Sequence, residues 1–154
     1  MHSSIIMSVF NSYFVHMFQS RDEIRQVYVS VWQKMQRKQL LEPMESVIAD
    51  IIQLHPEYHP YLDQGESIQH AEFIPEAGNS NPFLHMGMHI ALREQLSTDR
   101  PVGIKNIHQK LTARMGQHPA EHAMIDCLGQ ALWLAQRNNA MPDDDSYLLC
   151  LKQL

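Results

Sequence analysis

The chain has 154 residues, of which 44% are hydrophobic and 19% charged, and its formal net charge is −5 with the histidines neutral. This composition excludes a disordered chain, and the length favours one domain, which we predict over residues 17–154. The sequence has no long run of lysine or arginine that could bind the phosphates of a nucleic acid, and no apolar stretch approaches the roughly 18 to 20 residues that cross a bilayer. Nucleic acids and membranes are therefore not expected partners.

Residues 1–16 have no helix-capping signal and no clean hydrophobic period. Neither lysine nor arginine precedes their apolar residues, and no small-residue cleavage site follows, so a secretory signal is not expected. We therefore predict that residues 1–16 are an N-terminal extension outside the core.

The first predicted helix begins at Ser20, where the sequence SRDE forms a capping box with Glu23. Its apolar residues recur at steps of three and four, and they are Ile24, Val27, Tyr28, Val31, Trp32 and Met35. A second helix is predicted from about Pro43 to Leu54, because the two prolines of HPEYHP follow it. Residues 63–80 have no period and carry glycine, proline and polar side chains, which predicts a long loop.

Proline marks the start of the next three helices, since its fixed φ and missing N–H suit the first turn. We predict these helices from the cap Asn81 to about Leu96, from about Pro101 to Met115, and from Pro119 to about Arg137. A last helix begins in MPDDDS, where three aspartates suit a helix N-terminus. The sequence therefore predicts an all-α fold, a single compact bundle of five to six short-to-medium helices with one long loop.

The two cysteines, Cys127 and Cys150, are far apart in the sequence and form no C-x-x-C pair. Each lies among apolar residues of a predicted helix. This setting predicts reduced, buried thiols and a cytoplasmic protein.

Six of the ten histidines form three pairs with a spacing of four residues, at 55 and 59, 85 and 89, and 118 and 122. Residues four apart lie on one face of a helix. In HPEYH and HPAEH the first histidine precedes a proline near a helix start. The positive end of a helix dipole has two possible roles here. It can bind an anion, or it can keep nearby imidazoles neutral and therefore able to bind a metal.

The first hypothesis is a transition-metal site, with zinc or iron as the ion. His85 and His89 are its firmest ligands, because an i, i+4 pair is a common way to supply two imidazoles. Further ligands would come from HPAEHAMID, which offers His118, Glu121, His122 and Asp126. HMGMH lacks the glutamate of H-E-x-x-H, and neither a G-x-S-x-G motif nor a glycine-rich phosphate loop is present. Whether the protein is an enzyme therefore stays open.

The alternative hypothesis is that the histidines are structural and hydrogen-bonded in the core. The protein would then be a non-catalytic interaction module, whose FIPEAGNSNP segment or a helix face contacts another protein or a second copy of the chain. For His55 and His59, the neighbouring prolines and tyrosines favour a packed turn.

Several blocks of the sequence occur together in one order from Met17 onwards: MFQSRDEIR, HPEYH, NPFLHMGMHIALREQL, HPAEHAMIDCLGQALWLAQR and DDDSYLLCLKQ. With these blocks the chain resembles the bacterial domain of unknown function family numbered eighteen forty-one. The resemblance implies a small cytoplasmic protein of bacteria and no particular activity. It places on motif positions His85, His89, His118, His122, Asn81, Pro82, Glu94 and Glu121. Where that family tends to have glutamates, this chain has Asp126 and Gln130, so a role that needs an acid at 130 is in doubt.

Overall fold

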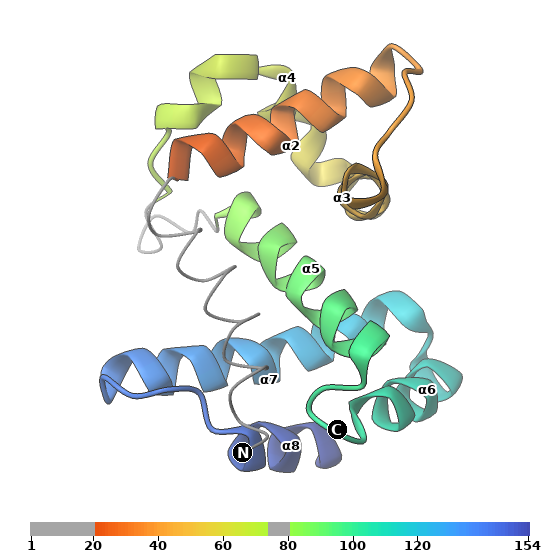
Figure 1. The fold of residues 1–154 in the computed structure, drawn as a ribbon, viewed down its shortest axis with the longest axis vertical. Helices are drawn as coiled ribbons and strands as arrows, with labels where there is room; N and C mark the ends of the chain where they lie inside the picture. The colour runs from red at the N-terminus through yellow and green to blue at the C-terminus, as the bar shows by residue number, and fades with distance from the viewer. Residues whose placement is uncertain (1–20, 74–80) are drawn as a thin grey trace. The chain divides into compact units, whose positions relative to one another are not determined.

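The computed structural model describes residues 21–73 and 81–154 (Figure 1). These residues form seven α-helices and two short 3-10 helices, with no β-strand among them. The all-α prediction is confirmed, and the expected number of five to six helices is too low. The predicted extension at 1–16 and the cap Ser20 lie outside the described residues.

The described residues divide into two compact units. We call residues 21–73 and 81–90 the N-terminal unit and Ala91–Leu154 the C-terminal unit. The single domain predicted for residues 17–154 stays a prediction. None of the described helices is both long and apolar enough to cross a membrane.

The N-terminal unit is built around helix α2, which packs against α3, α4 and the 3-10 helix η2 (Figure 1). Its elements are α2 (Arg21–Gln36), α3 (Pro43–Leu54), η1 (Pro56–Tyr58), α4 (His59–Asp63), η2 (Gly65–His70) and the first part of α5 (Pro82–Thr98). The core residues include Val29, Val31, Ile48, Ile51, Ile52, Leu62, Ile68, Met86 and Ile90. The bounds of α3 agree with the prediction.

The long loop predicted for residues 63–80 is wrong at Asp63 and over residues 65–70, and residues 74–80, which make up most of the FIPEAGNSNP segment, lie outside the described residues. Helix α4 ends at Asp63, and η2 follows as a second short helical segment. Leu62 and Ile68 are nearly fully buried there. The one or two apolar residues of each short segment are too few to display a period, so the burial of these segments against α2 is not visible in the sequence.

Helix α2 buries a face slightly different from the predicted one. Val27, which was expected to point inward, is 46% exposed, whereas Arg25 is only 2% exposed. The Arg25 guanidinium donates hydrogen bonds to the carbonyl oxygens of Ile68 (3.1 Å) and Ala71 (2.7 Å). These acceptors lie outside the helix, and because Arg25 points toward them, the buried face of α2 includes Arg25.

Helix α5 begins with the predicted cap. The Asn81 side-chain oxygen accepts hydrogen bonds from the backbone N–H groups of Phe83 (3.0 Å) and Leu84 (3.2 Å). These bonds satisfy two N–H groups that have no partner within the helix. We expect Asn81→Ala to lower the free energy of unfolding by about 1 kcal/mol in chemical denaturation, with Asn81→Ser close to wild type. Equal losses in both variants would contradict a capping role.

The C-terminal unit comprises the rest of α5, α6 (Ile104–Met115), α7 (Gln117–Arg137) and α8 (Asp144–Lys152). Helix α7 packs against both α6 and α8 (Figure 1). Its buried residues include Leu92, Ile104, Leu111, Met124, Ile125, Leu128, Tyr147 and Leu151.

Two predicted helix starts in this unit are shifted. Helix α6 begins at Ile104 rather than Pro101, because the Asp99 carboxylate accepts hydrogen bonds from the N–H groups of Gly103 and Lys105 at the helix start. Gly103 has a φ of +99°, which favours glycine. Helix α7 begins at Gln117, two residues before the proline that was expected to open it.

The prediction of two free thiols is wrong. Cys127 of α7 and Cys150 of α8 form a disulfide, with 5.8 Å between their Cα atoms. The packing of α8 on α7 brings the two residues together, and this pairing cannot be read from cysteine spacing alone.

Candidate metal centre

His55 is the first residue of the centre and lies directly after α3. The buried face of α3 contains Ile48, Ile51 and Ile52 and continues by one turn to His55, which is 0% exposed. The Nδ1 atom of His55 lies 2.7 Å from the carbonyl oxygen of Ile51. Because a carbonyl can only accept, Nδ1 carries a proton, and in the neutral imidazole Nε2 then carries the lone pair. His55 is therefore held in the tautomer that can bind a metal through Nε2.

His85 and His89 lie one turn apart on α5. His89 is 0% exposed, and His85 is partly buried. Their Nε2 atoms are 3.1 Å apart, and their ring centroids are 4.8 Å apart. Both imidazoles thus direct the same ring nitrogen toward one point.

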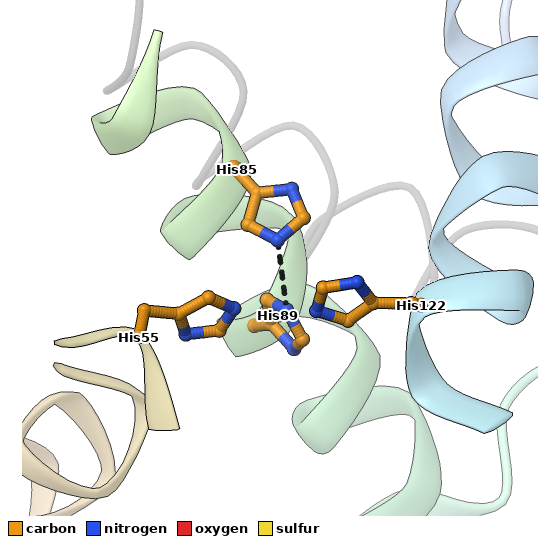
Figure 2. Close-up of side chains that lie close together, drawn as sticks. All are labelled: His55, His85, His89 and His122. Carbon is orange, nitrogen blue, oxygen red and sulfur yellow. Dashed lines mark hydrogen bonds between the residues drawn. The ribbon is translucent and has the colours of Figure 1, made fainter. Parts of the chain in front are cut away.

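The ring of His55 joins this pair from the end of α3 (Figure 2). Its centroid is 4.6 Å from that of His89 and 5.1 Å from that of His85. One ring nitrogen of each histidine lies within 4.8 Å of the other two. We call His55, His85 and His89 the histidine cluster, and all three belong to the N-terminal unit.

Tyr58 borders the histidine cluster. Its ring stacks on His55 at a centroid distance of 5.3 Å with 7° between the planes, and it meets the ring of His85 edge-on at 6.0 Å. Burial raises the pKa of the Tyr58 hydroxyl above its usual value, with a smaller contribution from the charge of Glu57. Tyr58 therefore stays protonated near neutral pH and restricts the rings of two cluster members.

This geometry allows two kinds of chemistry. Two imidazoles bound to one tetrahedral zinc ion at 2.0 to 2.1 Å have ligand nitrogens about 3.3 to 3.4 Å apart. The 3.1 Å between the Nε2 atoms of His85 and His89 is close to this value. The same distance also fits a hydrogen bond from one Nε2–H to the other Nε2. The arrangement is thus compatible with a metal ion and with a network of neutral imidazoles.

The two histidines of HPEYH have different surroundings. The Nε2 atom of His59 lies 2.9 Å from the carbonyl oxygen of Ile52. The centroid of the His59 ring is 4.3 Å from that of Trp32. The packed turn predicted for this segment describes His59 well. His55 instead faces the other two members of the histidine cluster.

The predicted ligands of α7 lie in the C-terminal unit. The ring centroids of His118 and His122 are 4.2 Å apart. Glu121 is 2% exposed, accepts a hydrogen bond from Gln117 (3.0 Å) and lies 3.5 Å from Nε2 of His108. Asp126 is exposed. That any of these α7 residues binds the same ion as His85 and His89 stays a prediction.

His55 is not among the ligands predicted from the sequence. A signal for it was present, because Ile48, Ile51 and Ile52 set a helical period whose next inward position is residue 55. A histidine at an inward position, next to a proline that ends the helix, is held in place by the turn.

Comparison with known families confirms the family resemblance that the sequence blocks indicated. The family model described as Domain of unknown function (DUF1841) matches residues 20–153. The chain belongs to this family. No curated protein and no solved structure matches this DUF1841 chain. All members of the histidine cluster lie within the matched range of the DUF1841 model.

Proposed function

We propose that this protein binds one transition-metal ion through the histidine cluster, with zinc or iron as the ion. The observation that carries the proposal is the convergence of three imidazole nitrogens within 4.8 Å of one another. Imidazole suits zinc, copper, iron and nickel, whereas magnesium and calcium prefer oxygen ligands. The hydrogen bond from His55 to Ile51 adds support, since metal-binding histidines commonly donate their second ring N–H to a carbonyl.

Metal titration of the untagged, metal-stripped protein tests this proposal. Competition against a chromophoric chelator should give one equivalent of tightly bound Zn²⁺ or Fe²⁺ and no binding of Mg²⁺. His55→Gln should weaken binding by about 100-fold or more, because loss of even an outer partner of a ligand costs roughly 10- to 100-fold. His59→Gln is the matched control, since His59 lies four residues away and bonds to backbone. A wild type that binds no metal would refute the proposal.

The contribution of α7 is a separate part of this proposal and rests on the spacing of HPAEHAMID. His118, His122, Glu121 and Asp126 are its candidates. His122→Gln should weaken metal binding if α7 supplies a ligand, and unchanged affinity would restrict the ligands to the histidine cluster.

Two other parts of the proposal also come from the sequence. A net charge of −5 supports a protein without a nucleic-acid partner. The family resemblance supports a cytoplasmic location in bacteria.

Exposed apolar residues of the C-terminal unit support a second candidate function, a non-catalytic interaction module. Trp133 and Leu149 are 56% and 60% exposed. Large exposed apolar side chains are frequent at protein–protein contacts. In that case the histidine cluster only stabilises the core, and substitutions of its histidines change the stability of the protein without changing its metal content. Sedimentation of wild type and Trp133→Ser would detect self-association that depends on Trp133.

A further inference from the structure

The disulfide of the C-terminal unit ties the last helix to α7. Its two cysteines differ in exposure, since the residue Cys127 is only 2% exposed whereas Cys150 is partly exposed. We therefore expect a thiolate reagent in solution to attack at Cys150 rather than at Cys127.

Apart from the disulfide, helix α8 contacts α6 and α7, and the Arg114 guanidinium donates a hydrogen bond to the backbone oxygen of Leu154. The helix has nine residues, and its buried side chains are Tyr147 and Leu151. The Tyr147 hydroxyl donates a hydrogen bond of 2.8 Å to Oε1 of Gln95. An isolated helix of this length is unstable in water, so α8 depends on its attachment to the rest of the unit.

We propose that the Cys127–Cys150 disulfide is a reversible redox site, and that its reduction by a dithiol releases α8 from α7. This inference is independent of the histidine cluster, which lies in the other unit. A partly exposed bridge on a helix of nine residues can be cut without dismantling the contacts between α6 and α7. Disulfides of cytosolic proteins are commonly of this transient, redox-sensing kind.

The chemistry is a balanced exchange of two electrons. One thiolate of the dithiol attacks Sγ of Cys150, the bond to Cys127 breaks, and Cys127 leaves as a thiolate that takes up a proton. The second thiolate of the dithiol then attacks the mixed disulfide and releases Cys150. The dithiol becomes a disulfide, and both protein cysteines become thiols.

Hydrogen exchange of the full chain, with and without dithiothreitol, tests the proposal. Residues 143–154 should exchange about 100-fold faster after reduction, because the bridge spans 23 residues and a crosslink of this span strongly favours the closed state. Residues 117–126 of α7 should change little, and reoxidation should restore slow exchange. The Cys127→Ser, Cys150→Ser double variant should exchange like the reduced protein and be insensitive to dithiothreitol.

Three results would overturn the proposal. One is unchanged exchange of residues 143–154 on reduction. Another is loss of protection over the whole C-terminal unit, which would make the bridge a general structural crosslink. The third is full alkylation of both cysteines by N-ethylmaleimide in protein purified in air without reductant, since the bridge would then not form.

Discussion

Replacing His85 and His89 together with alanine is expected to abolish metal-dependent stabilisation of this protein. A ligand that binds only the folded state, at a free concentration of about 100 times its dissociation constant, adds about 2.7 kcal/mol to the free energy of unfolding. Removing two of the three cluster imidazoles should reduce that increment to near zero. Denaturation of metal-stripped protein, with and without added Zn²⁺ or Fe²⁺, measures the increment directly.

The increment is the informative quantity because the metal-free double variant should itself be less stable. His89 is fully buried, so truncation to alanine leaves a cavity. His89→Gln retains most of the volume and serves as a second variant if the double variant does not fold. His59→Gln should keep the full increment, since its ring packs on Trp32. An undiminished increment in His89→Gln would contradict ligation by the histidine cluster.

Arg25→Ala is expected to have the largest effect on stability in the N-terminal unit, a loss of about 3 to 5 kcal/mol. The guanidinium lies over two aromatic rings that contact each other, with its Cζ 5.4 Å from the centroid of Phe73 and 5.1 Å from that of Phe83. It also donates to two backbone carbonyls, as described above. Truncation would remove these contacts together and leave an unfilled space in the core.

Urea denaturation of Arg25→Ala and of Arg37→Ala provides the measurement and its control. Arg37 directly follows α2 and is exposed, so its substitution should change stability by less than about 0.5 kcal/mol. Arg25→Lys should lie between wild type and alanine, because lysine keeps the charge but lacks the planar fork of donors. A loss of less than about 1 kcal/mol in Arg25→Ala would refute its structural role.

Helical periodicity and capping residues predict much of this fold. The bounds of α3, the cap Asn81 and the aspartates at the start of α8 follow from local chemistry, which acts within one or two turns. The inward orientation of Arg25 does not, because its acceptors are supplied by η2 and the residue after it, more than forty positions away. Tertiary partners decide such positions, and a single sequence does not display them.

In the candidate site, too, the local part could be predicted from the sequence and the tertiary part could not. The spacing of His85 and His89 predicts that they share one face of a helix, and their Nε2 atoms are close together. His55 comes from the end of another helix, thirty positions earlier, and its approach depends on how α3 and α5 fold in the N-terminal unit. The link between Cys127 and Cys150 likewise depends on the packing of two helices.

The central claim is that the imidazoles of the histidine cluster bind one metal ion. X-ray absorption spectroscopy of the zinc-loaded, untagged protein tests it most directly. We expect nitrogen scatterers at about 2.0 to 2.1 Å with the outer-shell pattern of at least three imidazoles, and no sulfur at about 2.3 Å. Loss of that imidazole pattern in His55→Gln, with retention in His59→Gln, would assign it to the cluster. A zinc ion surrounded only by oxygen ligands, or no bound zinc at all, would contradict the claim.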